Sequence, residues 1–371
     1  MQTRVSKLTN LLNQHHLDAI VLNPGPSLIY LTGLQFHLME RPTVAIFTVE
    51  GKAALVLPIL EQQKLTGLPF QPEVFSFGDD PATWQAAFTR ALAALGLHKG
   101  KVGVETTRLR VLELRFLEAA GKDLQFVDGS PVLEALRMVK DEGEIQKMRE
   151  AALIAQHALV ETLKAIRVGM TEKQIAAELM VQLYRADSDG ELPFQPIVST
   201  GPNTANPHAV PSERALQEGD LLLFDWGASR DGYFSDITRT FTAGQIDPEF
   251  LRIGDIVLAA NARGHGTARA GMPTGKVDQA VRAVIETAGY GACFTHRTGH
   301  GLGMEAHEAP YIFGENNLIL EPGMTFTVEP GIYLPGRGGV RIEDDVVVTQ
   351  EGVRSLTDLP RQVLPLETFK A

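Results

Sequence analysis

The 371-residue sequence predicts an α+β fold with internal pseudo-twofold symmetry, preceded by a smaller α/β domain. Three observations support this prediction. Helical and strand-like patterns alternate in the first third of the chain, whereas the remainder twice shows helical patterns followed by hairpin signals. Two distant segments of the remainder also share one arrangement of glycines and acids. A change of pattern near 136–141 predicts domains of residues 1–137 and 138–371.

The first domain has the pattern of an α/β sheet, with apolar runs of strand length separated by helical periodicity. Residues 50–52 (Glu-Gly-Lys) lie between two such runs and are expected to form a hairpin turn. We expect strands at 19–22, 43–49, 53–57, 101–104 and 124–127, and helices at 82–95 and 109–120. This part of the sequence shows no convergent cluster of histidines and acids, so we expect no chemistry of its own.

The second domain begins with a long amphipathic helix that is expected to end at Gly169. Its charged run 141–150 is interpreted as the solvated face. Thr171, with Gln174 three residues later, has the pattern of a capping box and predicts the start of the next helix. Two later helices are predicted, one from Asp247-Pro248 to near Gly271 and one from Thr274 to Gly289.

Composition excludes several classes of partner. The net charge is −11 and no basic cluster stands out, which argues against nucleic acid or an anionic membrane as a partner. No apolar run approaches the length of a membrane-spanning helix, and the N-terminus is too polar for a signal peptide. The single cysteine, Cys293, fits a reducing compartment. We therefore expect a cytoplasmic protein.

The stretch 220–241 organises the second domain. Four apolar residues of strand length lead to Asp225, and a β-prone return segment follows a turn and carries Asp236. This pattern predicts a hairpin with a wide loop and one acid on each arm. A strand that simply ends in solvent is the alternative for Asp225. An acid directly after buried apolar residues is otherwise expensive to desolvate unless it is paired or bound to a metal.

The same pattern recurs later in the chain. When Gly219 is aligned with Gly323, Asp225 coincides with Glu329, and each copy continues into a return strand with a second acid, which is Glu343 in the later copy. The repeat predicts a duplication in which each half directs two carboxylates to a shared centre. Four converging carboxylates cannot all stay ionised without cations between them. Two divalent cations would balance their charge (4 × −1 + 2 × +2 = 0).

Histidines also cluster in this domain. Residues 295–308 (THRTGHGLGMEAHE) contain His296, His300 and His307, and glycines around His300 permit close approach of the backbone to a ligand. The spacing indicates at least one metal ligand here but does not say which histidine it is. His208 lies in the segment 194–212, which is rich in Gly, Pro, Asn and Ser and is predicted to be a loop. An exposed histidine without a role is the alternative for His208.

The residues described above and the sequences around them resemble the creatinase/aminopeptidase P/prolidase metallopeptidases, which have a pita-bread catalytic domain. The resemblance rests on FDWGA, SDITRTF, TGHGLGMEAHE, VEPGIY and GVRIEDD, and it covers residues 138–371. The first domain is similar to the creatinase-like N-terminal domain of this family. The resemblance implies that Asp225 binds one metal ion, Asp236 and Glu343 bridge two ions, and His300 and Glu329 complete the second site.

The family also implies roles for other residues. His208 and His307 match two catalytic histidines that do not bind metal, His296 matches a histidine of the substrate pocket, and Arg341 matches a supporting arginine near Glu343. The implied nucleophile is a hydroxide that bridges the metal ions. Four oxygen-donor residues and one imidazole favour Mn²⁺, with Co²⁺ or Zn²⁺ as alternatives. A homodimer is a further family expectation.

The resemblance implies hydrolysis of the peptide bond before proline, either as a prolidase acting on Xaa-Pro dipeptides or as an aminopeptidase P acting on longer peptides. Arg297 favours the dipeptidase, because it could bind the terminal carboxylate of a dipeptide. Pairing of Arg297 with Glu305 or Glu308 is the alternative. The segment 39–42 (Met-Glu-Arg-Pro) is similar to a prolidase loop that closes over the site. A binding module without activity and metal-free creatinase chemistry are the alternatives from other classes.

Overall fold

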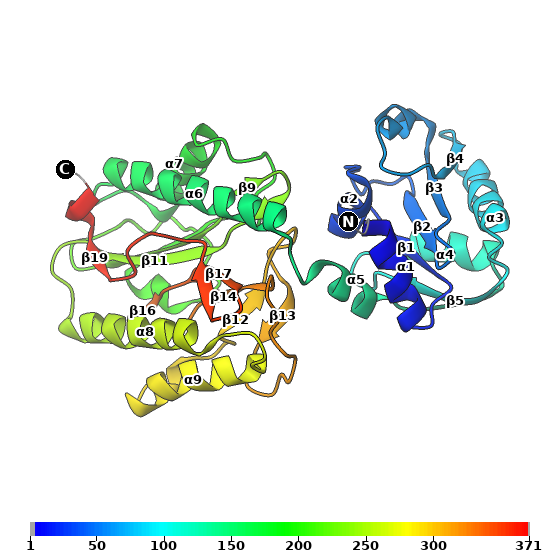
Figure 1. The fold of residues 1–371 in the computed structure, drawn as a ribbon. Helices are drawn as coiled ribbons and strands as arrows, with labels where there is room; N and C mark the ends of the chain where they lie inside the picture. Colours follow the sequence, from blue (N-terminus) through cyan, green and yellow to red (C-terminus); the bar gives the residue numbers. More distant parts are fainter. Residues whose placement is uncertain (1–3, 370–371) are drawn as a thin grey trace. The chain divides into compact units, whose positions relative to one another are not determined.

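The computed structural model describes residues 4–369 of the chain. The chain divides into two compact units, Met1–Arg137 and Met138–Ala371, and we propose that these are the two domains of the protein. Each unit has a hydrophobic core of its own and is described separately (Figure 1). Within the described residues, no helix is long and apolar enough to cross a membrane.

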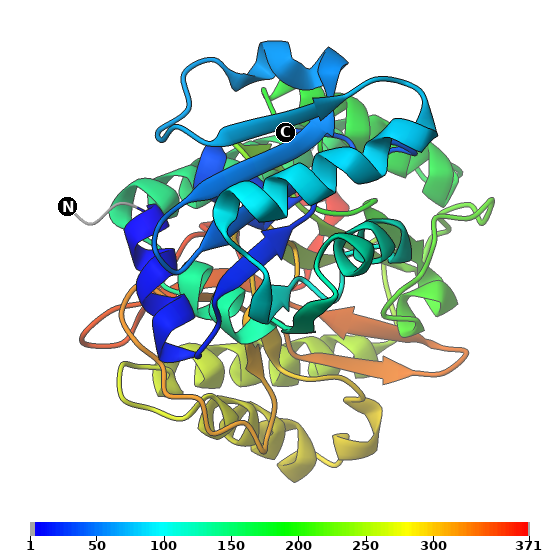
Figure 2. The same cartoon turned by 90° about the vertical axis from the view of Figure 1, so that its right-hand side faces the viewer.

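The first unit is a six-stranded mixed sheet in the order β4-β3-β2-β1-β5-β6. Its strands are β1 (Ala19–Leu22), β2 (Val44–Thr48), β3 (Ala53–Pro58), β4 (Glu73–Phe77), β5 (Lys99–Val104) and β6 (Asp123–Asp128). Its helices are α1 (Arg4–Gln14), α2 (Pro26–Thr32), α3 (Trp84–Leu95), α4 (Val111–Ala120) and α5 (Ser130–Arg137). Figure 2 shows α3 lying across one face of the sheet, where its apolar residues join the core. The predicted hairpin is confirmed, since β2 and β3 pair antiparallel around Gly51.

The second unit consists of two helix pairs with sheets between them, as Figure 1 shows. Its helices are α6 (Glu142–Ala165), α7 (Glu172–Arg185), α8 (Pro248–Thr267) and α9 (Thr274–Thr287). One sheet has the order β19-β11-β8-β7, from Leu364–Pro365, Ile237–Thr242, Leu221–Trp226 and Ile197–Thr200. The other has the order β13-β12-β14-β17-β18, from Glu308–Ile312, Gly299–Gly301, Thr325–Val328, Asp344–Val348 and Val353–Ser355. The hairpins β9-β10 (Ser229–Arg230, Tyr233–Phe234) and β15-β16 (Gly331–Leu334, Gly338–Arg341) complete the unit.

The two sheets are built in the same way. β8 pairs antiparallel with β7 and β11, and β14 pairs antiparallel with β12 and β17. Gly219 and Gly323, which the sequence alignment equates, both have φ of +89° in the turn before the strand. This left-handed conformation favours glycine. A β-bridge between Thr238 and Glu343 joins the two halves, so their acid-bearing strand ends meet.

Polar residues begin the helices largely where the sequence predicts. Thr171 and Gln174 form the predicted capping box of α7, and Asp247 caps α8. The interpretation of the charged run 141–150 as the solvated face of α6 is wrong in part, although Asp141 and Glu142 are exposed. Asp141 and Glu144 instead form a second capping box, and Glu144 is buried.

The assignment of 194–212 to a loop is wrong in part. Ile197–Thr200 forms strand β7, which pairs with β8, and a 3-10 helix η3 (Gly201–Ala205) follows. A four-residue strand flanked by Pro and Gly carries little periodic signal. Its stability comes from pairing with a strand that is distant in the sequence, which local patterns do not reveal.

Candidate functional site

Five of the predicted site residues lie where the two sheets meet, four of them at strand ends and His300 within a short strand. Asp225 is near the end of β8, and Asp236 directly precedes β11. His300 is the middle residue of β12, while Glu329 directly follows β14 and Glu343 directly precedes β17. The related hairpins therefore bring two carboxylates from each half of the unit into one place.

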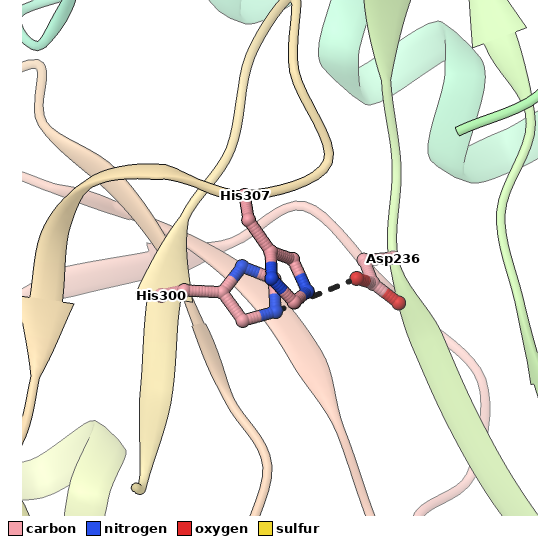
Figure 3. Close-up of side chains that lie close together, drawn as sticks. All are labelled: Asp236, His300 and His307. Carbon is pink, nitrogen blue, oxygen red and sulfur yellow. Dashed lines mark ion pairs between the residues drawn. The ribbon is translucent and has the colours of Figure 1, made fainter. Parts of the chain in front are cut away.

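The donor atoms of these residues are close enough to share cations. They fall into overlapping groups whose atoms lie within 4.8 Å of one another: Asp225, Asp236 and Glu343; His300, Glu329 and Glu343; and Asp236, His300 and His307. His300 Nε2 is 3.3 Å from Glu329 Oε1 and 3.7 Å from Asp236 Oδ2. Figure 3 shows the imidazoles of His300 and His307 side by side, both directed toward Asp236.

Without bound cations, the electrostatic interactions among the four carboxylates are unfavourable. Burial raises the pKa of all four carboxyls, and that of Glu329 reaches about 8. Repulsion adds to burial, since the charges of Glu343 and Asp225 further raise the pKa of Asp236. Raised pKa values in four neighbouring acids indicate that positive charge is missing from the group.

Unpaired oxygens support the same conclusion. Asp225 Oδ1 and Asp236 Oδ1 are buried and have no hydrogen-bond partner among the described residues. A buried carboxylate oxygen without a partner is costly, and a cation would remove that cost. The donor set of four carboxylates and one imidazole fits two divalent cations such as Mn²⁺.

Arg341 is buried beside the acids and lies near Glu343, whose pKa its charge lowers. It also bonds directly to an acid of the other half, since its Nη2 donates to Asp225 Oδ2 at 2.5 Å. Its link to Glu343 runs through Thr238, whose hydroxyl accepts from Arg341 Nε at 3.0 Å and donates to Glu343 at 2.6 Å. Arg341 therefore holds carboxylates from both halves of the unit.

His296 is engaged through both ring nitrogens. Its Nδ1 lies 2.8 Å from the carbonyl oxygen of Arg297, which only accepts, so Nδ1 carries the proton. Its Nε2 then accepts from the hydroxyl of Tyr333 at 2.8 Å, and that hydroxyl accepts from Arg341 Nη1 at 3.0 Å. Burial lowers the pKa of His296 to about 4, which agrees with a neutral ring. His296 can therefore offer a substrate its ring face.

His307 and Arg297 lie at the edge of the group. The rings of His307 and His300 are 3.8 Å apart, and burial lowers the pKa of both. Arg297 Nη2 is 3.4 Å from His307 Nδ1, and the guanidinium lies over the ring of Tyr311 at 4.6 Å. Among residues 4–369, no carboxylate forms an ion pair with Arg297, and Glu308 pairs with Lys140 at 2.6 Å.

His208 lies on the segment that follows η3. The carbonyl of the preceding residue, Pro207, accepts from Arg341 Nη2 at 3.4 Å. The charge of His208 also lowers the pKa values of Asp225, His296 and His307, so its exposed side chain lies near the acids. The structure thus brings together all ten residues that the sequence nominates.

Several supporting residues were not predicted. Asp345 accepts the backbone N–H of Asp236 at 3.0 Å, and Thr327 donates to Glu329 at 3.2 Å. Tyr333 connects Arg341 to His296, as described above. Asp345, Thr327 and Tyr333 lie in or beside VEPGIY and GVRIEDD, two of the strings on which the family resemblance rests. Nothing in the strings distinguishes a residue that supports a ligand from an ordinary strand residue.

Comparison with known proteins agrees with this geometry. The model of metallopeptidase family M24 matches residues 146–350, and that of the creatinase/prolidase N-terminal domain matches residues 4–139. A dipeptidase from Pyrococcus horikoshii OT3 has a similar structure, with a TM-score of 0.93 and 38% identity, covering 98% of this chain and 100% of that one.

Two further solved structures have different named activities. An Xaa-Pro dipeptidase from Bacillus anthracis is 32% identical with a TM-score of 0.87, and an X-Pro aminopeptidase from Thermotoga maritima MSB8 is 32% identical with a TM-score of 0.85. Each comparison covers 98% of this chain and 99% of the other. Similarity of this degree therefore does not separate the two activities.

Proposed function

Because this chain belongs to metallopeptidase family M24, we propose that it is a dinuclear-metal peptidase that hydrolyses the peptide bond before proline, with Xaa-Pro dipeptides as its preferred substrates. The observation that carries the proposal is the convergence of four carboxylates and His300, with buried oxygens of Asp225 and Asp236 left unpaired. Such a group needs about two divalent cations for charge balance.

In this proposal Asp225 would hold one cation, Asp236 and Glu343 would serve both, and His300 and Glu329 would hold the other. When bound, the cations would activate a water molecule as the nucleophile and polarise the scissile carbonyl. Mn²⁺ suits these oxygen-rich donors, and Co²⁺ or Zn²⁺ are the alternatives. Arg341 and Thr238 fix the carboxylate orientations on which the ligand geometry depends.

His307 and His208 are proposed to orient the substrate and stabilise the charge that develops on the scissile carbonyl. Arg297 Nη2 can donate to His307 Nδ1, which places the ring proton on Nε2. A protonated Nε2 is a hydrogen-bond donor and not a metal ligand. His307 therefore acts in this proposal as a donor beside the cations, although its ring is within ligand distance of Asp236 and His300.

Preference for dipeptides is assigned to Arg297. Its guanidinium is partly buried, lies beside His307 and forms no ion pair with a carboxylate in the described part of the chain. The terminal carboxylate of an Xaa-Pro dipeptide, one residue beyond the scissile bond, would supply that partner. The similarity to dipeptidases in the solved structures supports this choice.

An aminopeptidase P acting on longer peptides is the second candidate, and the similarity to an X-Pro aminopeptidase favours it. We further propose a cytoplasmic homodimer, as the single cysteine and the family suggest.

Hydrolysis of Ala-Pro and Ala-Pro-Ala by the manganese-loaded protein, with chelator-treated protein as control, tests the proposed activity. Faster cleavage of Ala-Pro supports the dipeptidase, and faster cleavage of Ala-Pro-Ala supports aminopeptidase P. No cleavage of either would indicate a binding module, and full activity without metal would contradict the metal site.

A further inference from the structure

Glu172, the first residue of α7, is a fully buried carboxylate outside the group of site residues. One of its oxygens accepts from the backbone N–H and hydroxyl of Thr200, at 2.7 and 3.0 Å, and from the side-chain amide of Asn203 at 2.9 Å. The other accepts from the backbone N–H and hydroxyl of Ser212, at 2.9 and 2.6 Å. A single carboxylate therefore joins the two ends of the segment 200–212.

This segment, which we call the His208 loop, lies against the site. The hydroxyl of Thr204 accepts from the backbone N–H of Gly339 in β16 at 2.8 Å. Three residues further along, the carbonyl of Pro207 accepts from Arg341. Glu172 holds the ends of the loop, and these two contacts hold its middle against the strand that carries Arg341.

The five hydrogen bonds require an ionised Glu172. Arg214 donates to the hydroxyl of Thr200 from Nη1 at 2.5 Å and to that of Ser212 from its backbone N–H at 3.1 Å. Both hydroxyl protons are therefore free to point to Glu172, which receives donors only. Burial acts to raise the pKa of Glu172, but the hydrogen bonds from Ser212, Asn203 and Thr200 outweigh it and lower the pKa below its usual value.

We propose that Glu172 is a positioning residue for catalysis, which fixes the His208 loop so that the His208 imidazole stays at the scissile carbonyl. This inference rests on the proposed function of His208. A loop whose ends are released samples more conformations, so the fraction with His208 in place falls. Misplacement of a catalytic group by about 1 Å can cost about 10²-fold in rate.

A double-mutant cycle tests the proposal. In Glu172→Gln the side-chain N–H₂ replaces one acceptor and faces groups that are already donors, so one end of the loop is released. On the manganese-loaded protein with Ala-Pro, Glu172→Gln is expected to lower kcat by about 10- to 100-fold. In a His208→Ala background the same substitution should change kcat by less than about threefold, because its effect passes through the missing imidazole.

Two readouts that do not depend on turnover accompany the cycle. Manganese stoichiometry should be unchanged in Glu172→Gln, and amide hydrogen exchange of the His208 loop should become faster in both the metal-free and the loaded protein.

Glu178→Gln is the matched control on the same helix, where the carboxylate accepts from Gln182. It should leave kcat and loop exchange unchanged. If Glu172→Gln does not fold, Ser212→Ala removes one donor of the same set and is expected to act in the same direction.

The outcomes separate the two proposals. An equal loss of kcat from Glu172→Gln in both backgrounds, loss of manganese, or unchanged exchange of the loop would each overturn the positioning role. A normal kcat in His208→Ala would contradict the proposed function at His208 and the catalytic part of this inference together. In that case, the rate of amide hydrogen exchange in the His208 loop would still show whether Glu172 fixes the loop.

Discussion

In the proposed function, the preference for dipeptides over longer peptides is assigned to Arg297. Arg297→Ala should raise KM for Ala-Pro by an amount equivalent to a charged hydrogen bond, roughly 1.5–3 kcal/mol, because the substrate carboxylate loses its partner. KM for Ala-Pro-Ala should change far less, since its carboxylate lies one residue further away. Steady-state kinetics with both peptides measure the difference.

Arg230→Ala is the matched control for this prediction, because Arg230 pairs with Asp187 at the surface. Equal effects of Arg297→Ala on the two peptides would show that Arg297 does not recognise the terminal carboxylate.

Metal content separates the histidines from the acids. His307→Ala and His208→Ala should lower kcat by about 10²–10³ and keep their manganese, because each would remove a proposed donor to the reacting carbonyl. Asp236→Ala and Glu343→Ala should lose manganese as well as activity. Elemental analysis of the purified variants, together with kcat, checks both halves of the prediction. Stoichiometric loss of metal from His307→Ala would identify that residue as a ligand.

At the scale of single residues, the proposed metal ligands could be predicted, whereas most of the residues that support the site could not. The four acids stand out for two reasons. An acid next to a buried strand is costly to desolvate unless it is paired or bound to a metal, and the pattern occurs twice. Tyr333 and Glu172 carry no such signal. A tyrosine in a strand and a glutamate in the first turn of a helix are both common, and only their tertiary partners give them a role.

Among the structural elements, the turns before β8 and β14 are the most informative. Gly219→Ala should destabilise the protein by about 1–2 kcal/mol, because φ is positive there. Gly323→Ala should cost more, because the added methyl group would lie 2.7 Å from the carbonyl oxygen of Lys140, compared with 3.4 Å from that of Gln245 at Gly219. Urea unfolding of the manganese-loaded protein measures both free energies.

Gly190→Ala serves as the control for these substitutions, since an added methyl group there meets no atom within 4 Å and φ lies outside the left-handed region. Equal stability of the Gly219 and Gly323 variants would show that the close carbonyl at Gly323 relaxes without cost.

The elements with local signals were predicted well. Capping residues locate the starts of α7 and α8, and apolar runs locate β1 and β8, because these signals reside in neighbouring residues. β7 was missed because its stability depends on β8. The end of α8 was placed near Gly271, whereas the helix ends at Thr267, since no residue of the sequence terminates it sharply.

For the whole molecule, stability without metal should depend on pH. The pKa of Glu329 is raised from 4.5 to about 8 in the folded state, so its contribution is fully present below pH 4.5 and is lost as pH rises through about 8. The pKa values of Asp236 and Glu343 are raised in the same direction. Chelated protein should therefore become less stable between about pH 5 and 8, as followed by urea unfolding through the fluorescence of Trp226 beside the site.

Manganese should remove this loss, because bound cations favour the ionised acids. The difference in unfolding free energy between loaded and chelated protein should then grow with pH. Asp236→Asn in chelator should flatten the dependence. A chelated protein whose stability rises over this range would contradict the convergence of the acids.

The family resemblance and the fold class predicted from the sequence are confirmed by the family models and the solved structures. The buried network behind the site was not predicted. Asp344 pairs with Arg239 at 2.7 Å and Arg361 at 2.6 Å, and Arg239 also donates to the carbonyl of Glu343 at 2.6 Å. These residues come from three separate segments, so no local pattern could bring them together.

If two cations bind as proposed, the duplicated architecture implies that they would be bound unequally. β7 and β12 occupy equivalent places beside β8 and β14. The offset of 104 residues between Gly219 and Gly323 (323 − 219) equates Leu222 of β8 with Phe326 of β14, and these residues pair with Thr200 and Gly301. In this register Ser199 corresponds to His300. One half thus supplies an imidazole where the other has a hydroxyl, so the proposed sites differ in ligand chemistry. Filling should be stepwise, and calorimetric titration of the chelated protein with Mn²⁺ should resolve a tight and a weak event.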